Sequence, residues 1–173
     1  MDDIAHKKIG IFLGRLQPQH TGHERMIEQI FQENDEVVLC VGSAQRITKS
    51  DPAFERNPLP VEIRTKRLET FLKEKAYKKP YRIVTAKDIE PDSAWPAYLK
   101  LVCAITDDTT NTVYFADTIP KEYEDGMKKI GFDIRFILRE KFLYKTAEDK
   151  LHHISSATEI RNLEKNIENL NRH

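Results

Sequence analysis

Short apolar segments alternate along the chain with longer segments in which apolar residues recur every three or four positions. Short runs rich in Val, Ile and Phe are typical of buried β-strands, and a period of three to four residues is typical of amphipathic helices. The pattern predicts strands over residues 9–13, 36–41, 81–85, 112–116 and 132–137. It predicts helices over residues 24–31, 60–73, 96–106 and 120–130, and a last helix that begins near Ser156 and runs toward Leu170.

Strands and helices in alternation predict an α/β fold. Consecutive parallel strands are joined by right-handed crossovers, which place helices on both faces of the sheet. We therefore predict a single doubly wound, five-stranded parallel sheet in one domain that spans residues 1–173. Residues 42–59 are polar and loop-like, but no internal repeat or convincing linker divides the chain.

The charges balance, because 28 Lys and Arg residues stand against 28 Asp and Glu residues. Proteins that wrap nucleic acid or lie on an anionic membrane usually carry a basic excess, so neither is an expected partner. No apolar run approaches membrane-spanning length, and residues 1–8 do not resemble a secretory signal. Cys40 and Cys103 lie in apolar stretches, which favours buried, reduced thiols and predicts a cytoplasmic location.

The loop after the first predicted strand is the first candidate site. In a doubly wound sheet, ligands bind at the carboxyl ends of the strands. The loop has neither a Gly-x-Gly-x-x-Gly nor a Gly-x-x-x-x-Gly-Lys-Ser/Thr motif, which argues against a dinucleotide-dependent dehydrogenase and a P-loop enzyme. It carries instead His20 and His23, with Gly22 between them, at the start of a predicted helix.

This histidine pair has the chemistry of a phosphate site. A helix N-terminus attracts anions, an imidazole can donate to a phosphate oxygen, and Arg15 adds a permanent positive charge. For the pair alone, a capping or surface role is an equally good interpretation. No metal site is predicted, because a third zinc ligand is missing and His23-Glu24 lacks the second histidine of a His-Glu-x-x-His helix.

A second candidate site lies near the other end of the chain. Ser156 and Glu159 have the spacing of a capping box, which is a purely structural explanation for those two residues. Arg161 lies one turn inside the predicted helix, where the helix dipole disfavours a cation unless an anion is held nearby. The hydroxyls of Ser155, Ser156 and Thr158 could help to hold such a phosphate.

Together the two segments resemble the nucleotidyltransferase superfamily, whose His-x-Gly-His and Ile-Ser-x-Thr-x-x-Arg motifs bind ATP. Three further features resemble the nicotinamide mononucleotide adenylyltransferases of the archaeal type. They are a Gly-Ser-Ala-Gln motif at residues 42–45, an Arg-Asn-Pro motif at residues 56–58 that is followed by Arg64, and Asp88 with Trp95 seven residues beyond it. The resemblance runs from Gly14 to Arg161, which is most of the chain.

The resemblance implies a Rossmann-like nucleotidyltransferase fold and an enzyme of NAD biosynthesis. Its reaction would be adenylyl transfer from ATP to nicotinamide mononucleotide, which gives NAD and pyrophosphate. Mg²⁺ would arrive with ATP, and the partners would be these small molecules and further copies of the chain in a homo-oligomer.

The resemblance also implies roles for individual residues. The expected catalytic residues are His20, His23, Arg15, Arg56 and Arg161. The expected contacts to ATP and its phosphates are Gly14, Arg15, Gly22, His23, Ser155, Ser156, Thr158 and Arg161. The expected contacts to the nicotinamide nucleotide are Gly42, Ser43, Gln45, Asn57, Asp88 and Trp95. Arg64, with Arg46 and Lys49 nearby, is expected to add to the positive charge of this phosphate pocket.

The chain departs from the family pattern at residues that border the adenosine part of the site, with Ala116-Asp117 in place of Gly-Asn and Ala157 in place of Gly. Two alternatives therefore stay open. A sister transferase for another phosphorylated acceptor, such as phosphopantetheine, would keep the ATP motifs without needing Asp88 and Trp95 at their spacing. A non-catalytic module that senses NAD or ATP would be expected to lose His20, His23 or Arg161.

Overall fold

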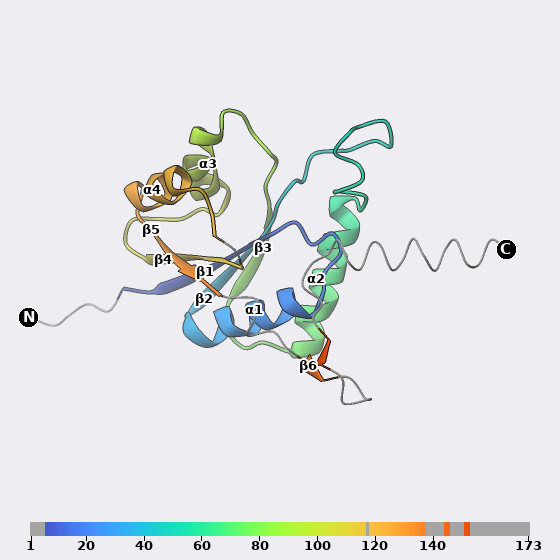
Figure 1. Cartoon of the computed structure of the whole chain (residues 1–173). Helices are drawn as coiled ribbons and strands as arrows, with labels where there is room; N and C mark the ends of the chain where they lie inside the picture. Colours follow the sequence, from blue (N-terminus) through green and yellow to red (C-terminus); the bar gives the residue numbers. More distant parts are fainter. Residues whose placement is uncertain (1–5, 117, 138–143, 146–150, 153–173) are drawn as a thin grey trace, which may run out of the picture.

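Five parallel strands form the central sheet of the protein (Figure 1). The computed structural model describes residues 6–116, 118–137, 144–145 and 151–152. The strands are β1 (Lys8–Gly14), β2 (Glu36–Val41), β3 (Tyr81–Thr85), β4 (Thr110–Phe115) and β5 (Phe132–Phe136). Their order in the sheet is β3-β2-β1-β4-β5, and every neighbouring pair is parallel. The predicted fold class is therefore confirmed.

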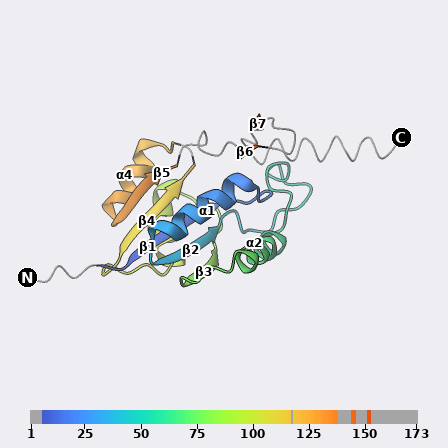
Figure 2. The ribbon, with the colours of Figure 1, turned by 90° about the horizontal axis from the view of Figure 1, so that it is seen from below.

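Helices cover both faces of this sheet. One face carries α1 (Thr21–Glu33) and α2 (Val61–Lys75), and the other carries α3 (Trp95–Val102) and α4 (Lys121–Lys129). Figure 1 shows the two pairs on opposite sides, and Figure 2 shows α1 lying in front of the strands. The short helix η1 (Asp92–Ala94) precedes α3, and β6 (Tyr144–Lys145) pairs with β7 (Leu151–His152) in a separate antiparallel ribbon.

Strand β2 shows why the central strands read as unbroken apolar runs. Val37, Leu39 and Val41 pack into the buried cluster under α1 and α2, whereas Val38 and Cys40 pack into the cluster under α3 and α4. Successive side chains of a strand point to opposite faces, so a sheet covered on both sides needs apolar residues at every position.

Two of the predicted element boundaries shift for identifiable reasons. The helix predicted over residues 96–106 ends at Val102, because Cys103 caps it and Ala104 adopts a left-handed conformation with φ of 47°. Strand β4 begins earlier than its apolar run, since Thr110 pairs with Lys8 at the start of β1. The helix predicted from Ser156 lies outside the described residues.

Both cysteines are buried, free thiols, as their apolar surroundings predict. Cys40 lies on β2 and Cys103 follows α3, and both belong to the cluster under α3 and α4. A hydrogen bond with Cys103 and burial raise the pKa of the Cys40 thiol. The thiol therefore stays protonated at neutral pH and acts as a small apolar side chain.

Gly10 allows α1 to lie close against β1. A Cβ atom at this position would lie 2.4 Å from Asn34 Nδ2 and 2.5 Å from Ile30 Cγ2. We expect Gly10→Ala to lower the free energy of unfolding by about 1–3 kcal/mol, because the added methyl group overpacks a filled interface. Urea denaturation measures this change. Gly126→Ala, inside α4, is the control and should be neutral or stabilising by up to about 1 kcal/mol, so an equal loss in both variants would contradict the prediction.

Candidate functional site

A hollow of about 460 Å³ lies where the order of the strands reverses, between β1 and β4. Doubly wound sheets bind ligands at this switch point, outside the carboxyl ends of the strands. The hollow is lined by residues from the ends of β1, β2 and β4 and from the segment after β3. They are Leu13, Gly14, Arg15, Gly42, Ser43, Asp88, Trp95, Phe115, Ala116, Thr118 and Ile119. Six of these (Gly14, Arg15, Gly42, Ser43, Asp88 and Trp95) are residues that the sequence motifs single out.

Asp88 is held in this hollow by two residues of the Gly-Ser-Ala-Gln motif. The Ser43 hydroxyl donates to Asp88 Oδ1 at 3.0 Å, and Gln45 Nε2 donates to Asp88 Oδ2 at 2.7 Å. In return, the Asp88 amide donates to Gln45 Oε1 at 3.0 Å. The loops that follow β2 and β3 are thereby fixed to each other, and the carboxylate keeps lone pairs with which it can accept from a ligand.

Trp95 is held in place by two tyrosines. Its ring centroid lies 6.4 Å from that of Tyr98 and 5.8 Å from that of Tyr123. The Tyr98 hydroxyl also accepts a hydrogen bond of 3.0 Å from the Lys87 amide, next to Asp88 in the chain. The indole is only partly buried and lines the hollow, so an aromatic surface stands beside a carboxylate. This combination suits a planar, cationic ring.

At the start of α1, His20 is the N-cap residue. Its Nδ1 accepts a hydrogen bond of 3.1 Å from the Gly22 amide, so the neutral imidazole carries its hydrogen on Nε2. The ring stacks on His23 with centroids 3.7 Å apart. A Cβ on residue 22 would lie 3.0 Å from the His20 ring, which explains the glycine between the histidines. His20 therefore has the capping role that was one interpretation of the histidine pair. This role leaves Nε2–H as the ring donor, so it is compatible with the other interpretation, donation to a phosphate.

Phe12 connects the histidines to the end of β1. Its ring lies edge-on to His23, with centroids 5.9 Å apart. A Cβ at Gly14 would lie 2.6 Å from the same ring. The absence of a side chain at Gly14 thus lets Phe12 fill the space between the end of β1 and the N-terminus of α1.

A second hollow of about 400 Å³ shares Ser43 with the first. Gln45, Arg46 and Asn57 also line it, and Asn57 is buried. The structure therefore places Asn57 beside the Gly-Ser-Ala-Gln loop but not in the hollow that holds Trp95. Arg56 and Lys49 are exposed and line neither hollow.

Arg64 corrects one expectation of the sequence analysis. It is 1% exposed, and its guanidinium donates to four backbone carbonyl oxygens, so it does not present its charge to a phosphate. Burial lowers the pKa of the guanidinium. The group stays charged at neutral pH, because the ordinary pKa of arginine lies far above it.

Part of the predicted site cannot be placed in the structure. Ser155, Ser156, Thr158 and Arg161 lie outside the described residues, as does Asp117. Conversely, sequence reasoning did not single out Phe115, Thr118 and Ile119, which form the wall of the hollow on the β4 side. Their position at the end of β4, or within four residues after it, was the signal that could have found them, because β4 borders the switch point.

No three His, Cys, Asp or Glu side chains lie together as metal ligands would, within the ranges that the structure describes. Among the same residues, no helix is both long and apolar enough to cross a membrane.

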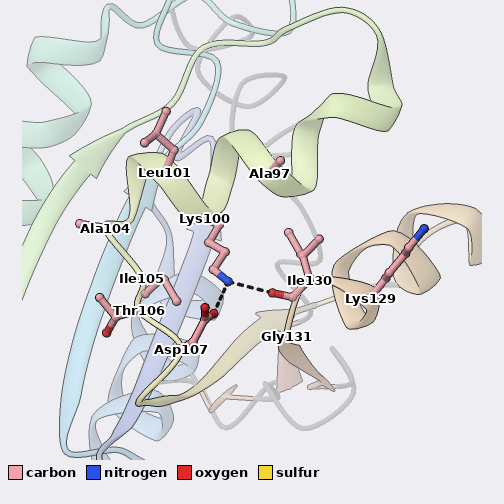
Figure 3. A pocket seen from close by; sticks show the side chains of 10 residues that line it. All are labelled: Ala97, Lys100, Leu101, Ala104, Ile105, Thr106, Asp107, Lys129, Ile130 and Gly131. Atoms are coloured by element: carbon pink, nitrogen blue, oxygen red, sulfur yellow. Dashed lines mark hydrogen bonds and ion pairs between the residues drawn. The ribbon is translucent and has the colours of Figure 1, made fainter.

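Another hollow, of about 900 Å³, lies between α3 and the end of α4 (Figure 3). Lys100 crosses it, and its Nζ donates to Asp107 Oδ1 at 2.5 Å and to the Ile130 carbonyl at 3.2 Å. Its lining residues precede β4 and β5, so they lie toward the amino ends of those strands. It is thus separate from the hollow at the switch point.

A parallel sheet in this order, with a hollow at its switch point, defines an α/β protein with a Rossmann-like fold. Residues 11–163 match the model of the cytidylyltransferase-like family, and the chain belongs to that family.

Curated relatives confirm the resemblance seen in the motifs. The chain is 30% identical over 126 residues to a nicotinamide-nucleotide adenylyltransferase of Methanococcus aeolicus. It is 34% identical over 91 residues to the enzyme of that name from Pyrococcus abyssi, and 35% identical over 98 residues to that from Halobacterium salinarum. These alignments cover 72%, 53% and 54% of this chain and 64%, 46% and 49% of the relatives, so the chain matches only part of their length.

Solved structures confirm the fold. A bifunctional NMN adenylyltransferase/ADP ribose pyrophosphatase from Francisella tularensis superimposes with a TM-score of 0.70 and 18% identity, over 91% of this chain and 42% of that chain. A NadR protein in complex with NAD and AMP-PNP superimposes with a TM-score of 0.57 and 24% identity, over 90% of this chain and 42% of that chain.

Proposed function

We propose that the protein transfers the adenylyl group of ATP to nicotinamide mononucleotide, giving NAD and pyrophosphate. The observation that carries this proposal is the hollow at the switch point, where Trp95 and Asp88 line the same space as Arg15, in the loop that leads to the His-x-Gly-His motif. Membership of the cytidylyltransferase-like family and the names of the archaeal relatives support the same reaction.

The two nucleotides would occupy different parts of this end of the sheet. The nicotinamide ring is planar and cationic, so the Trp95 indole and the Asp88 carboxylate would hold it. The phosphates would lie toward the N-terminus of α1, where His20 and His23 donate from their rings and the helix end is positive. Arg15, exposed at the edge of the hollow, would add a positive charge, and Arg161 with its neighbouring hydroxyls would complete the phosphate site.

The reaction needs positioning more than covalent chemistry. A 5′-phosphate oxygen of nicotinamide mononucleotide attacks the α-phosphorus of ATP, the bond to the bridging oxygen breaks, and pyrophosphate leaves with the electron pair. The nucleophile is already an anion at neutral pH, so no general base is required. The protein holds two mutually repelling anions in line and donates hydrogen bonds to the oxygens on which charge develops. Mg²⁺, entering with ATP as part of the substrate, would neutralise phosphate charge.

Purified protein with ATP, Mg²⁺ and nicotinamide mononucleotide provides the test, with NAD and pyrophosphate both measured. We expect the two products in equal amounts. Parallel reactions replace the acceptor with nicotinate mononucleotide or phosphopantetheine, and replace ATP with CTP. Pyrophosphate release that requires a different acceptor or CTP would overturn the proposal, and nucleotide binding without any pyrophosphate release would favour a sensor.

A further inference from the structure

We propose that Arg64 is a positioning residue that sets the backbone of the loops lining the hollow at the switch point. The inference rests on the proposed function for its kinetic consequence, but its structural basis is independent of the substrate. Arg64 lies in the first turn of α2 and is buried, although it carries a charge. Buried arginines are stable only when their donors are satisfied, so its partners indicate its role.

The guanidinium joins three segments of the chain. Nη1 donates to the carbonyl oxygens of Arg15 and Gly42, both at 2.7 Å. Nη2 donates to the Ser43 carbonyl at 2.9 Å, and Nε donates to the Leu59 carbonyl at 3.0 Å. The loops after β1 and β2 and the segment before α2 are therefore held by one planar group. Lysine cannot reproduce this fork of donors.

Two of these loops adopt backbone conformations that L-residues avoid. Leu16 directly follows the Arg15 carbonyl and has φ of 53°, and Ser43 directly follows the Gly42 carbonyl and has φ of 49°. Non-glycine residues in this left-handed region are strained and persist when their surroundings hold them. Arg64 donates a hydrogen bond to the carbonyl oxygen that precedes each of the two strained residues. These hydrogen bonds thereby fix the turns that directly follow β1 and β2 at the edge of the hollow.

Gln17 reinforces the same arrangement. Its Nε2 donates to the Leu59 carbonyl and its Oε1 accepts from the Leu59 amide, both at 2.9 Å. Gln17 is 2% exposed, so these bonds are shielded from water. Arg64 and Gln17 thus both donate to the Leu59 carbonyl. The loop after β1 is therefore tied to the segment before α2.

The loops that Arg64 holds carry residues of the proposed substrate site. Arg15 and Ser43 line the hollow, and Ser43 also donates to Asp88. Leu16 and Gln17 precede His20 in the same loop. Loss of the fork would therefore shift the groups that hold both proposed substrates, without removing any of them.

The variant Arg64→Lys tests this role, with Arg67→Lys as the matched control, because Arg67 is exposed on the same helix one turn further on. Circular dichroism first establishes that each variant is folded at the assay temperature. We expect kcat of Arg64→Lys to fall about tenfold with KM for ATP changed less than about threefold, since a misplacement of 1 Å can cost about 100-fold in rate. Arg67→Lys should retain the wild-type kcat.

Amide hydrogen exchange supplies a readout that does not depend on activity. The Gly42 amide donates to the Gly14 carbonyl and the Ala44 amide to the Ala86 carbonyl, at 3.0 and 2.9 Å. In Arg64→Lys we expect these two amides to exchange at least about tenfold faster, while amides within β4 keep their wild-type rates. Arg64→Gln, which keeps two amide donors, is the second variant if the lysine variant does not fold.

Two results would overturn the inference. The first is a folded variant with wild-type kcat and wild-type exchange at Gly42 and Ala44. The second is faster exchange throughout the sheet, with activity lost only in proportion to unfolding, because this would make Arg64 an ordinary core residue. A different case arises if the wild-type protein makes no NAD. The proposed function then fails by itself, and unchanged exchange at the two amides would separately refute the positioning role.

Discussion

Replacing His20 by alanine should lower kcat for NAD formation by about 100- to 1,000-fold, which is the usual effect of removing one donor to a developing oxyanion. KM for ATP should change little, because the imidazole donates most strongly to charge that appears during phosphoryl transfer. Steady-state kinetics with ATP and nicotinamide mononucleotide measures both constants.

The N-cap role of His20 requires a control that separates stability from catalysis. His20→Asn keeps a side-chain oxygen that can accept from the start of α1, whereas His20→Ala removes the cap and should cost about 1 kcal/mol of unfolding free energy. Both variants lack the imidazole Nε2–H, so both should lose turnover. If His20→Asn turns over like the wild type, the histidine serves only as a cap.

Replacing Trp95 by alanine should raise KM for nicotinamide mononucleotide by about 10- to 30-fold, because a desolvated cation–π contact contributes up to about 2 kcal/mol. KM for ATP should stay within about threefold of the wild-type value, since the phosphates would lie toward α1. Initial rates measured against each substrate separately give the two constants. Trp95→Phe keeps an aromatic face and should show a smaller increase.

The control for Trp95 comes from the same helix. Leu101 is 78% exposed on α3 and lines the hollow of Figure 3, so Leu101→Ala should change neither KM. An equal rise in KM for both substrates in Trp95→Ala would mean that the indole only supports the packing of Tyr98 and Tyr123. That outcome would remove Trp95 from the proposed nicotinamide site.

The fold could be predicted because its determinants are local. The predicted boundaries of β2 and β3 coincide with the observed ones, since both strands are short runs rich in β-branched residues. The end of α3 could not be predicted, because the left-handed residue after its C-cap, Ala104, is not a glycine. Periodicity reports which face of an element is buried, but it carries little information about where a buried chain turns.

The candidate site was predictable where short motifs follow strands, as with Gly42, Ser43 and Asp88. The role of Arg64 was not, because a single arginine near a phosphate motif suggests a phosphate contact, whereas its partners are carbonyl oxygens brought together only by folding. The wall formed by Phe115, Thr118 and Ile119 was missed for a related reason. These residue types are common in any core, so only their position in the sheet identifies them.

The two sides of the hollow at the switch point are held in different ways. The four carbonyl partners of Arg64 all come from residues 15–59, whereas the wall on the β4 side is formed by Phe115, Ala116, Thr118 and Ile119. The loops that carry Arg15 and Ser43 are thus braced by a charged group, whereas none of the four Arg64 hydrogen bonds reaches the wall on the β4 side. Substitutions in that wall can alter which molecule fits without moving the braced loops. Ala116 belongs to this wall and is expected to border the adenosine part of the site, so changes of nucleotide preference are accessible on this scaffold at positions where the reaction geometry is least at risk.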